Sequence, residues 1–282
     1  MKEKSAVESF NHWSNNAEGR VQEFFDHQAA TFEKRAGLPA DCCRDIARAV
    51  MYIGETRKDD LLLELGPGTG QIGRWFEERV RYVGLDLSEG MLREFRAHLY
   101  KQGMKRRALV RADGQSTWPV ADGCARVIFS SRAAHLLEQE HVAQEFFRVA
   151  SNERATLIIG RVRREPQSTR ARMAREMNER LRGHGLEGRG GEVQSRKLFE
   201  ACRHRGAEIL EPSTVARWTV SASPQQSLDS WRSLRSLGGI NVSAPAREEI
   251  LKELESWART EFGSLEREHE SEETYVLYPL RL

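Results

Sequence analysis

The chain has 282 residues, of which 30% are charged, with 44 Lys and Arg against 42 Asp and Glu and a net charge of +2. This length suits one large domain or two small ones, and the 39% apolar content is typical of a folded protein. The near-balance of charge excludes a generally polycationic protein, and the apolar runs are too short to cross a membrane. The charged first ten residues lack the apolar segment of a signal peptide, so we expect a cytoplasmic protein.

The first part of the chain predicts helices and then a strand with a glycine turn. Residues 5–50 are expected to be mostly helical, because apolar residues recur at spacings of three to four. Residues 60–65 form a short apolar run that stops at Gly66-Pro-Gly-Thr-Gly70, and a helical stretch through Phe76 follows. This order indicates a strand, a turn and a helix.

The middle of the chain repeats this alternation. Residues 82–86 are predicted to form a strand, and Ser88 is expected to cap the next helix. Further strands are expected at 109–110, 127–130 and 155–159. Strands separated by helices predict an α/β fold with a Rossmann-like, doubly wound and mostly parallel sheet, whose strands all end at one edge.

The last third has a different character. An Arg-rich stretch runs from Gly160 to about Gly191, a helix passes through Leu198, and a strand is expected at 215–221. Ser223-Pro224 is a typical helix start, and residues 250–262 have the pattern of an amphipathic helix. A final strand is expected at 274–278. Without repeats or a long linker, one elaborated domain is preferred.

Acidic residues and glycines gather where three successive strands are predicted to end. Glu64 precedes the glycines Gly66, Gly68 and Gly70, Asp86 follows Gly66 by 20 residues, and Asp113 follows the third strand. A carboxylate at the position of Asp86, about 20 residues after the glycine turn, binds the ribose hydroxyls in nucleotide-binding βαβ units. Gly68-x-Gly70-x-x-Gly73 also matches a dinucleotide fingerprint, but Glu64 beside the turn would repel a diphosphate.

These motifs together resemble the class I S-adenosylmethionine-dependent methyltransferases, particularly those acting on small molecules. The resemblance is carried by residues 62–70, 84–92, 111–114, 127–131 and 135–137, in the family's order and spacing. It implies S-adenosylmethionine as cofactor and no metal. The resemblance implies that Gly66, Gly68 and Gly70 contact the methionine part of the cofactor and that Glu64 lies near its amino group. Asp86 would bind the ribose, and Leu87, Met91, Asp113 and Gly114 would surround the adenine. Ser130, at the end of the fourth strand, is also expected to bind the cofactor.

The resemblance also implies the domain layout. Residues 1–58 would form a helical N-terminal lid, and 59–282 a methyltransferase core with an acceptor-binding elaboration at about 161–206. The lid pattern is Phe25-Asp26-x-x-Ala29-x-x-Phe32, with Phe32 in place of the usual tyrosine. The C-terminal strand would be antiparallel to the others. Arg126 stands where relatives often have an acidic residue, a change expected to affect the surface rather than the cofactor.

The acceptor is the least constrained part of the prediction. His135 is the best-placed general base for a hydroxyl acceptor, although a histidine there often only packs. Residues 161–206 contain 13 Arg and Lys against 6 Glu, whereas residues 247–273 contain 4 basic and 10 acidic residues. The arginines would bind an anionic small molecule or an acidic carrier protein, or they would form a solvated helix with internal ion pairs. Nucleic acid is not expected, because no RNA-binding module accompanies them.

The sequence therefore predicts transfer of a methyl group from S-adenosylmethionine to a small organic acceptor, with O-methylation ahead of N- or C-methylation. The absence of an Asn or Asp-Pro-Pro-aromatic motif after residue 130 counts against base and amide nitrogens. Two alternatives stay open. One is a non-catalytic protein that binds S-adenosylmethionine and senses it or engages a partner, and the other is a dinucleotide-dependent oxidoreductase.

Overall fold

The computed structural model describes four single positions of the N-terminal region, Asp26, Ala29, Phe32 and Glu33, and then residues 37–104, 107–151, 154–186, 191–234, 236–237 and 240–282. Most of the predicted lid, including Phe25, lies outside the described residues. In the part of the chain described, no helix is both long and apolar enough to span a bilayer.

A single mixed sheet organises the fold. Its strands are β1 (Leu61–Leu65), β2 (Arg81–Asp86), β3 (Arg107–Arg111), β4 (Ala125–Ser131), β5 (Thr156–Arg164), β6 (Glu208–Ile209), β7 (Ser213–Ala222) and β10 (His269–Arg281). The order is β3-β2-β1-β4-β5-β10-β6, and β7 pairs with β10. Strands β1 to β5 are parallel, and β10 is antiparallel to β5. The predicted Rossmann-like sheet with an antiparallel C-terminal strand is confirmed.

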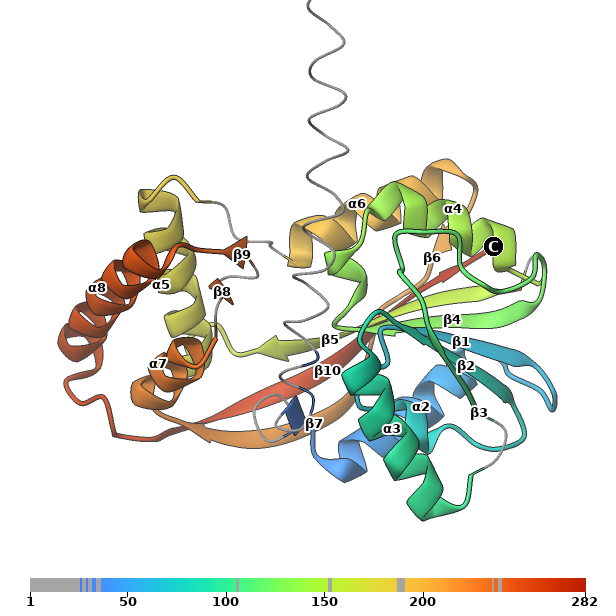
Figure 1. Cartoon of the computed structure of the whole chain (residues 1–282), viewed down its shortest axis with the longest axis horizontal. Helices are drawn as coiled ribbons and strands as arrows, with labels where there is room; N and C mark the ends of the chain where they lie inside the picture. Colours follow the sequence, from blue (N-terminus) through green and yellow to red (C-terminus); the bar gives the residue numbers. More distant parts are fainter. Residues whose placement is uncertain are drawn as a thin grey trace, which may run out of the picture.

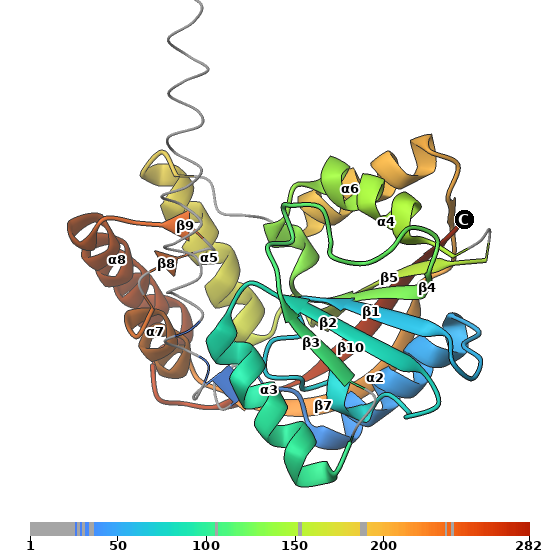
Figure 2. The same ribbon diagram turned by 45° about the vertical axis from the view of Figure 1, so that its right-hand side comes forward.

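Helices cover both faces of this sheet, as Figures 1 and 2 show. Helices α4 (Gln139–Val149) and α6 (Gly191–His204) pack on one face through Phe146 and Leu198. Helices α2 (Ala40–Ile53) and α3 (Glu89–Gln102) cover the other face, where Ile46 and Phe95 are fully buried. Because the parallel strands are covered on both sides, every residue of β1 is buried. All of them are leucines except Glu64.

Three further helices form a unit at one end of the sheet. They are α5 (Thr169–Gly183), α7 (Pro224–Arg232) and α8 (Ala244–Phe262), and the short strands β8 (Ser236–Leu237) and β9 (Ile240–Asn241) pair beside them. Met173, Leu228 and Leu254 belong to a hydrophobic cluster of their own. The predicted start of α7 is confirmed, because Ser223 and Gln226 form a capping box ahead of the helix.

The basic and acidic segments of the sequence meet in this helical unit. Arg172 on α5 pairs with Glu261, and Arg180 lies 3.7 Å from Glu253 on α8. Glu273 on β10 accepts from Arg164 at 2.9 Å and from Arg170 at 3.3 Å. Four arginines of residues 161–206 thus pair with acidic residues of 247–273. These pairs favour a structural role for that basic excess.

The prediction of a helix directly after the glycine turn is wrong. Only a single 3₁₀ turn, η1 (Gly73–Trp75), forms there. The chain crosses the sheet so closely that a Cβ at Gly73 would lie 2.5 Å from the Tyr82 hydroxyl and 2.7 Å from Glu64 Oε2. Glycine is required for this approach, and glycine is also a poor helix former.

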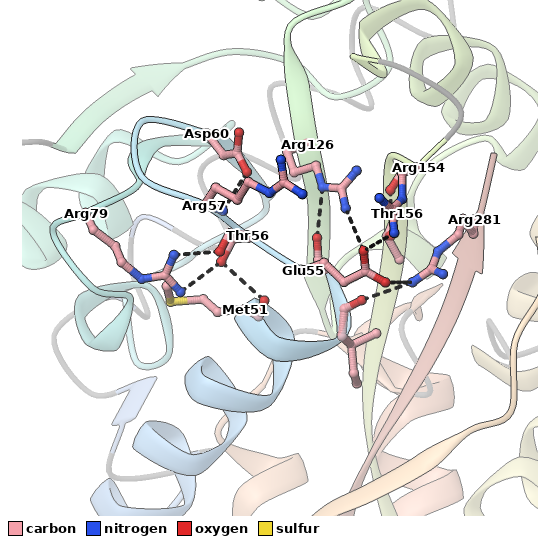
Figure 3. A network of polar contacts seen from close by, with 12 residues as sticks. Met51, Glu55, Thr56, Arg57, Asp60, Arg79, Arg126, Arg154, Thr156 and Arg281 are labelled. Atoms are coloured by element: carbon pink, nitrogen blue, oxygen red, sulfur yellow. Dashed lines mark hydrogen bonds and ion pairs between the residues drawn. The ribbon is translucent and has the colours of Figure 1, made fainter.

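Arg126 belongs to an ion network at the amino-terminal edge of the sheet (Figure 3). Its side chain donates to the carbonyl of Gly54 at 3.0 Å and pairs with Glu55 at 3.3 Å. Glu55 also binds Arg154 at 2.9 Å and Arg281 at 3.2 Å. With 9% of its surface exposed, Arg126 is buried rather than superficial. It joins α2, β4, β5 and β10 at the edge opposite the predicted cofactor site.

Candidate functional site

The glycine turn after β1 leaves open space at its centre. Gly66, Gly68 and Gly70 all have positive φ, at 66°, 58° and 78°. A Cβ at Gly66 would overlap Ala133, and one at Gly70 would overlap the Phe95 ring, whereas no described atom lies within 4 Å of the Cβ position at Gly68. Gly66 and Gly70 are therefore required for packing, while Gly68 leaves room for a ligand to approach the backbone.

Asp86 connects the glycine turn to the start of α3. Its Oδ2 accepts from the amide of Gly68 at 2.9 Å, and its Oδ1 accepts from the amide of Ser88 at 2.9 Å. Burial raises the pKa of Asp86, and hydrogen bonds from the backbone amides of Ser88, Gly68 and Leu87 act in the opposite direction. A carboxylate has about four lone-pair positions, so the group retains acceptor capacity for a hydroxyl donor of a ligand.

Glu64 lies beneath the turn rather than on its surface. Its carboxylate is 1% exposed and accepts from the Tyr82 hydroxyl at 2.6 Å. Burial raises the pKa of Glu64 to about 7, although the bond from Tyr82 and the nearby Arg107 favour the charged form. The structure therefore gives this carboxylate a partner inside the core, and its contact with a cofactor amino group stays a prediction.

The residues predicted to surround the adenine follow β2 and β3. Leu87 is half-buried and Met91 is buried on the first turn of α3. Asp113 accepts from the amide of Gln115 at 2.9 Å, and the Gly114 carbonyl accepts from the Trp118 indole at 3.2 Å. These residues lie at the carboxyl edge of the sheet together with Asp86 and the turn, as the sequence predicted; their adenine contacts stay predictions.

Ser130 and His135 follow the end of β4. The Ser130 hydroxyl is fully buried, donates to the Leu65 carbonyl at 3.0 Å and accepts from the Ala134 amide at 3.1 Å. Ser130 thus ties β1 to the 3₁₀ turn η2 (Ala134–Leu136). His135 lines a cavity of about 270 Å³ together with Gln115, Glu138 and Gln194 of α6, so a base at this position would act from that side.

Two residues of the segment predicted to form a lid reach this edge. Asp26 accepts from the Ser88 hydroxyl at 2.5 Å and from the Gly90 amide at 2.8 Å. Glu33 accepts from the Thr69 hydroxyl at 2.9 Å and pairs with Arg74 at 3.3 Å. Glu33 and Asp26 therefore bind the glycine turn and the start of α3, respectively. The acidic residue after Phe32 was the signal that could have indicated this contact.

No metal centre is found in the described parts of the chain, where no group of three or more His, Cys, Asp and Glu side chains could hold an ion. The four cysteines are all free thiols. Burial raises the pKa of Cys43 to about 11. Such a thiol stays protonated and is a poor nucleophile.

Comparison with known families places residues 62–153 in a methyltransferase domain family. This segment contains the glycine turn, Asp86, Asp113 and His135. The chain carries a methyltransferase domain of the class I, S-adenosylmethionine-dependent family. A curated relative, the malonyl-[acyl-carrier protein] O-methyltransferase of Laribacter hongkongensis (strain HLHK9), is 33% identical over 140 residues. That match covers 46% of each protein, so the chain aligns with about half of this relative.

Solved structures share the fold across most of the chain. A candidate methyltransferase of Bacillus halodurans C-125 superposes with a TM-score of 0.55 and 18% identity, covering 83% of this chain and 97% of its own. The YcgJ protein of Bacillus subtilis superposes with a TM-score of 0.53 and 18% identity, covering 86% of this chain and 97% of its own. The [4+2]-cyclase SpnF superposes with a TM-score of 0.57 and 14% identity, covering 94% of this chain and 96% of its own. These likenesses show the fold, and SpnF shows that the fold alone does not determine the reaction.

The candidate site fits S-adenosylmethionine, the cofactor of the class I family. The observation behind this fit is the open space at Gly68, flanked by an Asp86 carboxylate that retains acceptor capacity. A pyrophosphate would instead need the amino terminus of a longer helix at the turn, and η1 has only three residues. This geometry disfavours the dinucleotide alternative.

Proposed function

We propose that this chain transfers a methyl group from S-adenosylmethionine to an oxygen of a small acidic acceptor. The observation that carries the proposal is the joining of Gly68 to Asp86 by a 2.9 Å hydrogen bond at the carboxyl edge of the sheet. This bond holds the ribose-binding carboxylate beside the space where the methionine part would lie. The residues Gly66, Gly68, Gly70, Asp86, Asp113 and Gly114 are proposed to hold the cofactor.

The chemistry asks little of the protein beyond alignment. When bound, S-adenosylmethionine supplies a methyl group already activated by its sulfonium. The chain's own task is to hold the acceptor oxygen in line with that methyl group and to exclude water. Asp26 and Glu33, which bind the α3 start and the glycine turn, are proposed to close the lid over this reaction.

An acceptor with a carboxylate fits the site better than one with a simple hydroxyl. A carboxylate is ionised at neutral pH, so its oxygen needs no general base. The Laribacter relative is named for O-methylation of a malonyl group on an acyl-carrier protein. We therefore propose a malonyl-type thioester as the first acceptor to test, free or on an acidic carrier protein. His135 is proposed to act as a base only if the acceptor is a hydroxyl.

Calorimetry and turnover test this proposal separately. The wild-type chain is expected to bind S-adenosylhomocysteine, and Asp86→Ala is expected to weaken that binding at least tenfold. Incubation with S-adenosylmethionine and a panel of malonyl, hydroxyl and amine acceptors is expected to release S-adenosylhomocysteine fastest with the carboxylate. Absence of cofactor binding by the wild type would refute the proposal.

A second candidate is a protein that binds S-adenosylmethionine without transferring its methyl group. The likeness to SpnF, named as a cyclase, favours keeping it, because the same fold serves another reaction there. Tight binding of S-adenosylhomocysteine with no methyl transfer to any acceptor of the panel would support this candidate instead.

A further inference from the structure

Glu273 on β10 is a buried carboxylate that binds two arginines. Its side chain is 5% exposed, and its Oε1 accepts from Arg164 Nε at 2.9 Å and from Arg170 Nη1 at 3.3 Å. Arg164 ends β5, and Arg170 lies on the first turn of α5. The cluster is therefore located where β5 leads into the helical unit (Figure 1). Because two cations share one carboxylate, the cluster has a formal charge of +1.

Other arginines of α5 differ from this pair. Arg172, Arg180 and Arg182 each pair with a carboxylate of their own. Arg164 and Arg170 have no hydrogen bond or ion pair with any described residue other than Glu273, and their side chains are 43% and 41% exposed. A guanidinium carries several N–H donors, and each of these two uses one on Glu273. The remaining donors can bind an acceptor group from outside the chain.

The register of the sheet turns this cluster towards the proposed active site. Glu273 lies opposite Arg164 on β5 and opposite the half-buried Trp218 on β7, so the three side chains share one face. Tyr275, two positions along β10, points to the same face and donates to the Ser131 hydroxyl at the end of β4 at 2.5 Å. The two cations therefore lie on the face that extends from the carboxyl end of β4, bordered by an indole.

We propose that Arg164 and Arg170, held in place by Glu273, form an anion-binding pair for the methyl acceptor. The proposal rests on the proposed function, and it narrows anion recognition within residues 161–206 to two arginines. The group that they bind is a carboxylate or a phosphate, because either can accept from two guanidinium groups at once. A malonyl thioester offers the malonyl carboxylate, and a phosphopantetheine arm adds a phosphate. Arg164 and Arg170 determine acceptor specificity, and Glu273 is a positioning residue.

Single substitutions test the pair, because Glu273 then keeps one arginine. Arg164→Gln and Arg170→Gln each reduce the formal charge of the cluster from +1 to zero. The probes are S-malonyl-pantetheine and S-malonyl-phosphopantetheine, titrated by calorimetry at saturating S-adenosylhomocysteine. If the carboxylate is bound, each variant is expected to bind both probes about 10-fold more weakly. If the phosphate is bound, only the phosphorylated probe is expected to lose affinity, by a similar factor. Either result supports the pair and identifies the group.

Arg163→Gln is the matched control. Arg163 precedes Arg164 on β5 and points to the opposite face, where its side chain is 45% exposed, pairs with Glu192 on α6 and donates to the Tyr278 hydroxyl at 2.8 Å. The control removes the same charge at the neighbouring position, so its affinity for both probes is expected to stay within twofold of the wild type. Thermal melting checks that each variant is folded, and the affinity for S-adenosylhomocysteine is expected to be unchanged in all three.

The anion-binding pair and the proposed function can fail separately. If the wild type binds S-adenosylhomocysteine but Arg164→Gln and Arg170→Gln bind both probes within twofold of the control, the pair is refuted while the proposed function stands. The pair is equally refuted if the wild type binds neither probe, and a loss confined to one variant refutes a shared site. If the wild type binds no S-adenosylhomocysteine, the proposed function is refuted, and the pair falls with it.

Discussion

The glycine turn allows protein stability and cofactor binding to be separated by two alanine substitutions. At Gly70 an added Cβ has to enter the left-handed region and to displace the fully buried Phe95 ring. The backbone cost is about 1 to 2 kcal/mol, and overpacking adds about 1 to 3 kcal/mol. Gly70→Ala is therefore expected to destabilise the fold by about 2 to 5 kcal/mol.

Gly68→Ala is the matched control, because it has the same kind of backbone strain but no described atom within 4 Å of the new Cβ. Its expected cost is about 1 to 2 kcal/mol. For a chain of this size, 1 kcal/mol corresponds to about 2 °C in Tm, so we expect Tm decreases of about 4 to 10 °C for Gly70→Ala and about 2 to 4 °C for Gly68→Ala.

Cofactor affinity is expected to follow the opposite order. The Cβ of Gly68→Ala would occupy the open space proposed for the methionine part, so the affinity for S-adenosylhomocysteine should fall at least tenfold in calorimetry. The folded fraction of Gly70→Ala should lose less affinity for S-adenosylhomocysteine, because its new Cβ points into the core. Equal loss of Tm in the two variants, or normal binding by Gly68→Ala, would refute this account of the turn.

Three other predictions concern titratable groups of the site. Asp86→Asn removes the charge and one of the two carboxylate oxygens that accept from the backbone amides. Calorimetry should therefore show S-adenosylhomocysteine bound about 10- to 100-fold more weakly, and unchanged affinity would contradict the ribose role. Because burial raises the pKa of Glu64 from 4.5 to about 7, its contribution to stability is present below pH 4.5 and decreases by about 3 kcal/mol as the pH rises to 7. Urea unfolding should show this decrease in the wild type relative to Glu64→Gln, and parallel pH profiles would count against it. His135→Gln should lower kcat for a hydroxyl acceptor about 100-fold or more, and an equal loss with a carboxylate acceptor would show that His135 shapes its cavity rather than removing a proton.

The sheet and the placement of Asp86 and Asp113 could be predicted because both depend on local patterns. Apolar runs punctuated by glycine predict strands and turns, and parallel strands bring their carboxyl ends to one edge. The cap at Ser88 depends on a short-range bond, its hydroxyl accepting from the Met91 amide at 3.1 Å. Such features need only neighbouring residues to be correct.

Contacts between distant segments could not be predicted in the same way. The short 3₁₀ turn at Gly73 results from its approach to Tyr82, which lies on another strand. The bond from Thr69 to Glu33 and the pairing of Arg172 with Glu261 join residues 36 and 89 positions apart. Charge counts along the chain therefore overstate the exposed charge, because opposite segments neutralise each other only in three dimensions.

The separate hydrophobic cluster of α5, α7 and α8 has a consequence for how the molecule opens. Met173 and Leu254 belong to a hydrophobic cluster that includes no described residue of the eight-stranded sheet. The helices reach this unit from the ends of β5 and β7, and α8 leads back into β10 (Figure 1). Such a unit has an opening free energy of its own, so amide hydrogen exchange in α5 and α8 can proceed by local unfolding while β1 and β4 stay protected. The strands that carry the proposed cofactor site can therefore stay folded while this unit opens.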